Sequence, residues 1–188
     1  MHIWIDIDRV ECVAFTKAIV DELNKRGHKV TITAQNSKDI KNQLNKHNLN
    51  AKVIGFVFSM FGIFLKPLNM LRSFKLEDYI KSRNIDVSFS MGSTPMLYTC
   101  FSNKMLIILF LENKNQKVNK WHFIFDKICF IISDASFEEF LLEKGYELKY
   151  MQRYNRHSEP FCDNPSQILV KEIADKIEYL ATSHNLIA

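Results

Sequence analysis

The sequence has little glycine, with 5 glycines among 188 residues. It contains neither G-x-G-x-x-G nor G-x-x-x-x-G-K-[ST], the patterns whose backbone N–H groups hold phosphates. The four cysteines, Cys12, Cys100, Cys129 and Cys162, are widely spaced and form no C-x-x-C pair. This spacing argues against a metal site or a disulfide framework and favours a reducing cytoplasm. We therefore expect no glycine-rich nucleotide loop, no cofactor and no metal.

The sequence also lacks a hydrophobic run long enough to cross a bilayer as a helix, which takes ~20 residues. An uncharged and almost entirely apolar stretch, Val53–Leu65, has 13 residues. Two interpretations stay open: a buried helix or strand plus helix, or an apolar surface patch at Phe56–Leu65 that contacts a membrane. Lysines and an arginine flank the stretch, at Lys52, Lys66, Arg72 and Lys75. No signal peptide pattern precedes the first strand, so we expect a cytoplasmic protein, with peripheral membrane contact as the alternative.

Charge of neither sign dominates the chain. Lysine and arginine number 25 against 21 acidic residues, which gives a net charge of +4, and the basic residues are scattered. A nucleic-acid partner is therefore not expected. The 47% hydrophobic and 24% charged content is that of a globular domain, and the length suits one domain with a substantial core.

Strand-like and helix-like patterns alternate along the chain. The first unit reads as a strand at Ile3–Ile7, a helix that stops at Gly27, and a strand at Val30–Thr33. The further expected elements are a helix at Ser37–His47, a strand at Ala51–Gly55, a helical crossover that Pro67 kinks or restarts and that Leu76–Arg83 completes, strands at Asp86–Met91, Met105–Leu111, Lys127–Ile132 and Glu147–Met151, helices after Pro95 and before Gly145, and a last helix capped by Asn164. This alternation predicts an α/β fold: a single Rossmann-like domain with a mostly parallel sheet of about six or seven strands and helices on both faces. Residues 1–160 would form the domain, and residues 161–188 a C-terminal helix that packs back on it.

Polar residues follow the expected strands, and the carboxyl ends of parallel strands meet at one edge. The sequence therefore predicts a polar cleft there, suited to a polyhydroxylated ligand such as a sugar. The helix start after Gly92 could bind an anion or a hydroxyl, or could simply be capped by Ser93 or Thr94. Cys12 could act as a nucleophile at a helix start, although no partner histidine is marked. The predicted catalytic residues are Asp8, Cys12 and Glu112, and the predicted ligand-binding residues are Asp6, Gly92, Ser93, Thr94, Asn113, Ser133, Asp134, Tyr154, Asn155 and Glu159.

The opening stretch, from Ile3-Trp-Ile-Asp-Ile-Asp8 to Glu22-Leu-Asn-Lys-Arg-Gly-His-Lys-Val-Thr-Ile-Thr-Ala34, resembles that of a prokaryotic family defined by a domain of unknown function. That family in turn resembles B-type glycosyltransferases and UDP-N-acetylglucosamine 2-epimerase. The resemblance continues at Asp86–Ser93 and, more faintly, at Phe110–Lys114 and at Tyr154 to Glu159, near the hinge to a second domain. It implies a sugar or nucleotide-sugar ligand.

This sequence departs from the family pattern in its first turn, where a proline pair and histidines are usual and residues 9–14 stand instead. A histidine there would be the natural general base. The acidic cluster after the fifth strand is reduced to Glu112 and Asn113. B-type transferases also use two Rossmann-like domains, and this length accommodates one. Phe56–Leu65 falls where related lipid-acceptor transferases carry a membrane-facing patch.

The resemblance therefore implies a glycosyltransferase-like acceptor-binding half-domain that needs a partner chain with a donor domain, or a homo-oligomer. The alternative is a non-catalytic binding or assembly module that has lost the chemistry of the family. A third hypothesis is a small thiol enzyme that uses Cys12.

Overall fold

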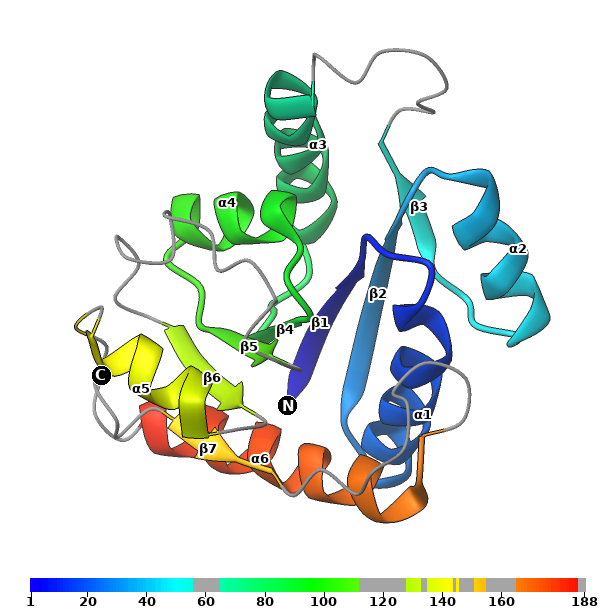
Figure 1. Cartoon of the computed structure of the whole chain (residues 1–188). Helices are drawn as coiled ribbons and strands as arrows, with labels where there is room; N and C mark the ends of the chain where they lie inside the picture. Colours follow the sequence, from blue (N-terminus) through cyan, green and yellow to red (C-terminus); the bar gives the residue numbers. More distant parts are fainter. Residues whose placement is uncertain are drawn as a thin grey trace.

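A parallel β-sheet forms the centre of the protein. The computed structural model describes residues 1–55, 65–111, 128–132, 135–143, 145, 151–154 and 165–185. Its sheet has seven strands in the order β3-β2-β1-β4-β5-β6-β7, and all the pairings are parallel (Figure 1). The strands are β1 (His2–Ile7), β2 (Lys29–Gln35), β3 (Lys52–Ile54), β4 (Val87–Ser90), β5 (Ile107–Leu111), β6 (Ile128–Ile132) and β7 (Met151–Arg153). The predicted fold class is confirmed.

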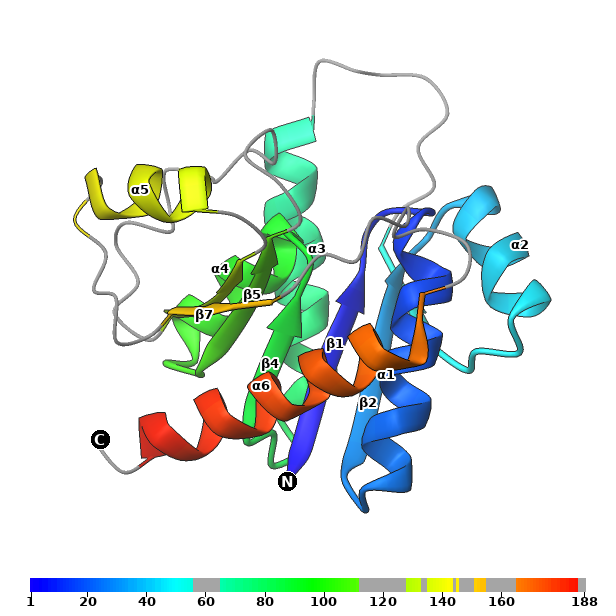
Figure 2. The same ribbon diagram turned by 60° about the horizontal axis from the view of Figure 1, so that its bottom comes forward.

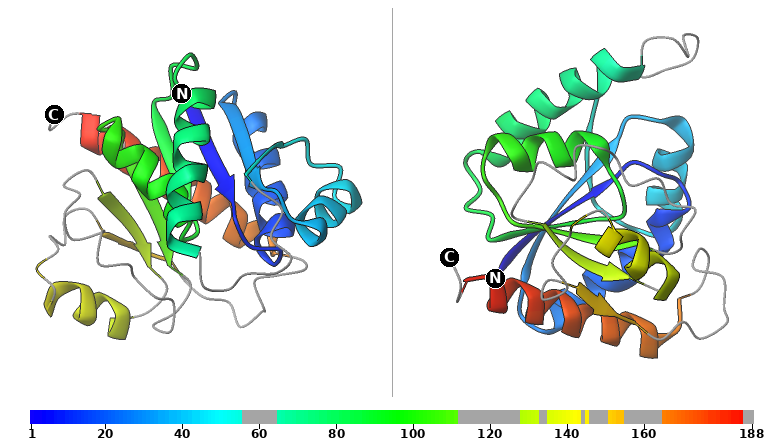
Figure 3. Two further views of the ribbon diagram at one scale, coloured as in Figure 1. Left: turned by 90° about the horizontal axis from the view of Figure 1, so that it is seen from above. Right: turned by 60° about the vertical axis from the view of Figure 1, so that its left-hand side comes forward.

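Helices cover both faces of the sheet, as the two sets of buried apolar side chains show. On one face, the odd residues of β1 pack with α1 (Cys12–Lys25), α2 (Lys38–Lys46) and α6 (Gln167–Asn185). On the other face, Trp4 of β1 packs with α3 (Leu65–Ile80), α4 (Thr94–Ser102) and α5 (Ala135–Glu143). Figure 2 shows α6 crossing the first face, and Figure 3 shows α3 beside α4 on the second. β1 and β5 are therefore buried from both sides, in keeping with their almost uninterrupted apolar sequences.

Two helix termini follow the local sequence signals that predict them, a capping serine and a glycine stop. Ser37 caps α2 by accepting a hydrogen bond from the N–H of Ile40, and the seam residues Ile40 and Leu44 are buried. α1 ends before Gly27, whose φ of +82° lies in the left-handed region that glycine adopts without strain.

Three boundaries differ from the expectations. α3 ends at Ile80 instead of Arg83, and Pro67 lies in its first turn, where proline does not break a helix, so Pro67 starts the helix, as one of its two expected effects, and does not kink it. β7 begins at Met151, the last residue of the range expected for it. The last helix begins at Gln167, and its cap is Ser166, whose Oγ accepts from the N–H of Leu169 at 3.3 Å. Asn164, the expected cap, lies outside the described residues.

The last helix packs back on the domain as the sequence predicts. Its stripe of Leu169, Ile173, Ile177 and Leu180 is buried in the same core as α1 and β1. Arg26, just after α1, binds the carboxylates of Asp175 (2.6 Å) and Glu178 (3.0 Å) on α6. The division into residues 1–160 and residues 161–188 stays a prediction.

Candidate functional site at the carboxyl ends of β1 and β4

The strand order places a topological switch point between β1 and β4. These strands are neighbours in the sheet, but β1 leads into α1 on one face and β4 leads into α4 on the other. In open parallel sheets, ligands bind outside the carboxyl ends of the strands at such a point, because the two connections diverge there. The described residues at this point are Asp6 to Arg9 at the carboxyl end of β1 and Ser90 to Thr94 at the carboxyl end of β4.

Asp6, a predicted ligand-binding residue, lies inside the protein rather than at an open edge. The residue as a whole is 1% exposed. Arg72 of α3 donates to both of its oxygens, at 2.9 Å and 2.7 Å. The hydroxyls of Thr33 and Ser93 donate as well, at 2.6 Å and 2.5 Å. Four hydrogen bonds therefore compensate the buried carboxylate, and Asp6 joins three elements instead of facing solvent.

Arg72 is the residue that sequence reasoning missed at this site, where it figured only as a basic flank of the apolar stretch. Its Nε donates to the carbonyl of Ile54 at 3.0 Å, so it ties α3 to the ends of both β1 and β3. Gly55 gives it room: a Cβ there would lie 3.2 Å from the Arg72 Cδ, and the φ of Gly55 is +122°. No local pattern distinguishes this arginine from the other basic residues near it, because its partner is 66 positions away.

Asp8 is the carboxylate that the structure leaves partly open at this edge. Burial, and then the nearby charge of Asp6, raise the pKa of Asp8 from 3.8 to about 6, while Arg9 and Arg72 oppose the shift. The guanidinium of Arg9 donates to the carbonyl of Met91 at 2.7 Å and lies 3.5 Å from Glu11. Arg9 thus connects the turn after β1 to the turn after β4, and its side chain remains 37% exposed.

The turn after β4 is a capped helix start. Ser90 Oγ accepts from the backbone N–H groups of Gly92 (3.0 Å) and Ser93 (2.9 Å). Ser93 Oγ accepts from the N–H of Met96, so Ser93 is the N-cap of α4, and its side chain is fully buried. The capping interpretation therefore holds for Ser93. Gly92, with a φ of +112°, and Thr94 stay partly exposed beside it.

Cys12 and Tyr154 lie in the interior. Cys12 is the first residue of α1 and is 6% exposed. Tyr154 is 3% exposed, and its ring stacks on Phe110 with centroids 5.2 Å apart. Burial raises the pKa values of the Cys100 and Cys129 thiols to about 12, which keeps both protonated. A thiol nucleophile therefore finds little support among these three cysteines.

The remaining predicted site residues lie outside the described residues, as does most of the apolar stretch at Phe56–Leu65. They are Glu112, Asn113, Ser133, Asp134, Asn155 and Glu159. A further polar residue follows β2: Asn36, whose Nδ2 donates to the Gly55 carbonyl at 3.2 Å and whose buried Oδ1 has no hydrogen-bond partner among the described residues.

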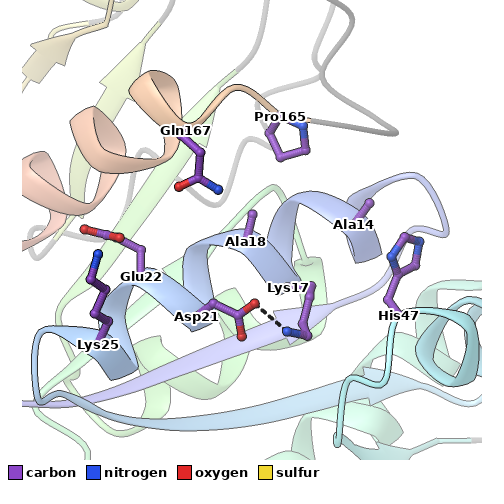
Figure 4. A pocket seen from close by; sticks show the side chains of 9 residues that line it. All are labelled: Ala14, Lys17, Ala18, Asp21, Glu22, Lys25, His47, Pro165 and Gln167. Atoms are coloured by element: carbon purple, nitrogen blue, oxygen red, sulfur yellow. Dashed lines mark hydrogen bonds and ion pairs between the residues drawn. The ribbon is translucent and has the colours of Figure 1, made fainter.

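Among the described residues, no cluster of three or more His, Cys, Asp or Glu side chains could hold a metal ion. No helix within those residues is both long enough and apolar enough to span a membrane. One groove runs between α1, the end of α2 and the start of α6, away from the strand ends (Figure 4).

Residues 1–177 match the family described as "Protein of unknown function (DUF354)". The chain belongs to this family. The predicted membership in a family defined by a domain of unknown function is thus confirmed. No match was found among the curated proteins.

Solved structures with this fold include sugar-nucleotide epimerases and glycosyltransferases. The UDP-GlcNAc 2-epimerase from Methanocaldococcus jannaschii is 16% identical, with a TM-score of 0.64 over 81% of this chain and 45% of its own. The epimerase from Neisseria meningitidis, bound to UDP-GlcNAc, is 14% identical, with a TM-score of 0.64 over 80% and 45%. A glycosyltransferase from Rickettsia africae is 13% identical, with a TM-score of 0.57 over 94% and 49%.

These likenesses show the fold that the DUF354 chain shares with those proteins. The chain spans less than half the length of each of the three.

Proposed function

We propose that this DUF354 protein binds a sugar or nucleotide-sugar at the carboxyl ends of β1 and β4, as the acceptor-binding half of a glycosyltransferase-like system. The observation that carries the proposal is Asp8, a partly exposed carboxyl at the switch point with a pKa of about 6. The shared fold supports it, because one neighbour of that fold is bound to UDP-GlcNAc.

Asp8 suits an acid/base role. A carboxyl with a pKa near 6 exchanges a proton close to neutral pH, as a general base for a sugar hydroxyl must. Arg9 and Thr94 lie on the two turns that flank it and offer hydrogen-bond donors to the ligand. Glu112 and Asn113, which follow the neighbouring strand β5, would complete the site.

A partner would supply the donor site. The neighbours are about twice as long as the part of them that this chain matches, and B-type transferases place their donor site mainly on the second half. We propose that a second chain, or a second copy of this chain, takes that role here.

We also propose that the acceptor is presented at a membrane surface. α3 follows the uncharged stretch directly, and it keeps an apolar exposed face with Met70 at 55%, Leu71 at 46% and Phe74 at 53% exposure. Exposed apolar side chains of this kind are typical of surfaces that contact a membrane or another protein.

Binding by the purified chain tests the proposal. Saturation-transfer NMR with UDP, UDP-GlcNAc and simple glycans would identify a ligand, and amide shifts would map it. We expect the shifts to include Asp8, Arg9, Gly92 and Thr94. Asp8→Asn should weaken binding by about fivefold, the effect of one hydrogen bond, and should lower any turnover by about 10²–10⁴-fold.

Asp78→Asn is the matched control, because Asp78 is an exposed aspartate in the last turn of α3 and lines neither the proposed site nor the groove beside α1. Ligand shifts confined to other regions, or equal losses in both variants, would contradict the proposal. Failure of every UDP-sugar and glycan to bind would contradict it as well.

The alternative is a non-catalytic binding or assembly module. The observation that favours it is the interior position of Asp6 and Cys12, together with a first turn that carries no histidine. Binding at the switch point without turnover, in the presence of every candidate partner chain, would select this alternative.

A further inference from the structure

A second concave surface lies on the outer side of α1, away from the strand ends. It is a groove of about 380 Å³ between α1, the C-terminal end of α2 and the start of α6 (Figure 4). This volume lies within the range of small-molecule sites. Polar and charged side chains predominate along it, so its ligand would be hydrophilic.

Two alanines of α1 form the floor of the groove, and a basic side chain lies at each of its ends. Ala14 and Ala18, one turn apart on α1, form the floor of the groove, and their small side chains leave its space open. Gln167 of α6 lies above this floor. His47, the C-cap of α2, stands at the end near Ala14, and Lys25 stands at the opposite end. The α1 positions from Ala14 to Lys25 span about 16 Å along the helix axis. The groove is therefore elongated and has a basic side chain at each end.

The acidic side chains of the groove already have partners. Asp21 forms an ion pair with Lys17, and Glu22 binds Arg26 at 2.9 Å. In the part of the chain that the structure describes, the side chains of Lys25 and His47 form no hydrogen bond or ion pair. Among the described residues, the groove thus keeps a lysine without an ion-pair partner at one end and a hydrogen-bonding imidazole at the other. Its carboxylates pair with Lys17 and with Arg26, which also binds Asp175 and Glu178.

We infer that this groove binds an elongated, polyhydroxylated ligand that carries a negatively charged group at each end, such as a sugar bisphosphate or a short acidic oligosaccharide. Lys25 binds one anionic group and His47 donates a ring N–H to the other. Gln167 hydrogen-bonds to hydroxyls between them. This site is separate from the proposed site at Asp8 and does not depend on it.

A series of probes that differ in charge tests the inference on the intact chain. Fructose 1,6-bisphosphate, glucose 6-phosphate and glucose carry two, one and no phosphate groups. A short uronic-acid oligosaccharide represents the other proposed ligand class, the acidic oligosaccharides. In amide-shift titrations we expect affinity to fall about tenfold for each phosphate removed. The shifted signals should come from residues 14–25, His47 and Gln167.

Lys25→Gln should lower the affinity for the bisphosphate about tenfold, to that of the monophosphate. Lys81→Gln, at an exposed lysine beyond the end of α3 and outside the groove, is the matched control and should change nothing. Ala18→Leu should block binding by filling the floor, with its melting temperature measured as a check on folding. The inference is overturned if the three probes bind alike, if neither acidic class binds, if the shifts lie outside the groove, or if Lys25→Gln and Lys81→Gln behave alike.

Discussion

At the scale of single residues, the ion pair of Asp6 and Arg72 dominates the region around the proposed site. Both side chains are almost fully buried, with exposures of 0% and 5%. Removing one partner leaves an uncompensated buried charge, which costs about 3–5 kcal/mol. We therefore expect Arg72→Met to lower the free energy of unfolding by that amount in urea denaturation.

The matched control is Lys17→Gln, which breaks an exposed ion pair on α1. Exposed pairs contribute about 0–1 kcal/mol, so this variant should unfold almost as the original protein does. Equal losses of unfolding free energy in Arg72→Met and Lys17→Gln would show that the buried ion pair of Asp6 and Arg72 does not stabilise the packing of α3 on the sheet.

Asp8 gives a pH-dependent prediction. Because its pKa rises from 3.8 to about 6 on folding, the folded state binds the proton more tightly than the unfolded state between those values. The contribution of Asp8 to the free energy of unfolding thus falls as the pH rises between these two pKa values. The destabilisation by its buried charge is complete above pH 6. Asp8→Asn removes this destabilisation. The free energy of unfolding of the variant should therefore exceed that of the original protein by up to about 3 kcal/mol at pH 7.5.

The measurement is the difference in unfolding free energy between the original protein and Asp8→Asn from pH 4 to pH 8. That difference should grow from pH 4 to pH 6 and then stay level. Asp21→Asn, which breaks an exposed ion pair on α1, is the matched control and should change the free energy of unfolding by about 1 kcal/mol or less. A flat difference for Asp8→Asn would mean that the environment of its carboxyl is ordinary.

The sequence could not separate the roles of Asp6 and Asp8. Alternation along β1 predicts that the two aspartates share a face, and strand ends are the right place to search for a site. What distinguishes them is distant in the chain: Arg72, Ser93 and Thr33 reach Asp6. The partners of a buried carboxylate depend on tertiary packing, which no local pattern encodes.

At the scale of elements, Arg26 fastens α6 to α1. Its guanidinium binds Glu22, Asp175 and Glu178, and these carboxylates raise the pKa of Arg26. Lysine cannot reproduce the planar fork that contacts several carboxylates at once. We expect α6 to open separately from the sheet, so Arg26→Lys should speed amide hydrogen exchange in α6 and leave exchange in β1 and β4 unchanged.

The control for this variant is Lys176→Gln. It removes an ion pair within α6, in which Lys176 lies 3.6 Å from Glu172. It should leave exchange in α6 nearly unchanged. Faster exchange throughout the sheet in Arg26→Lys would instead indicate that α6 and the sheet open as one unit.

The order and type of the elements were predictable because hydrophobic periodicity and helix stops are local. Gly27 and Ser37 define boundaries that the structure reproduces. At Pro67 and before Gln167 the local preferences of the residues suit two neighbouring arrangements, and the sequence does not choose between them. Proline fits a first turn as well as an interruption, and Ser166 caps a helix as well as Asn164 does.

At the scale of the whole molecule, α3 links the proposed site to a surface. Arg72 points from this helix to the end of β1, while Met70, Leu71 and Phe74 are exposed. A bilayer in contact with those side chains would lie near the strand ends, where a lipid-linked acceptor could reach Asp8. Burying one such side chain contributes about 1.5–3 kcal/mol. Met70→Gln combined with Phe74→Gln should therefore weaken binding to phosphatidylcholine–phosphatidylglycerol vesicles at least tenfold in a flotation assay.

The matched control is Tyr179→Gln, because Tyr179 is 56% exposed on α6, which covers the other face of the sheet. It should float with vesicles as the original protein does. If the original protein does not bind vesicles, or if Tyr179→Gln loses as much binding as the α3 variant, the apolar face of α3 is not a membrane contact. Its exposure would then favour a protein partner on that side of the strand ends, where a donor-binding chain would have to dock.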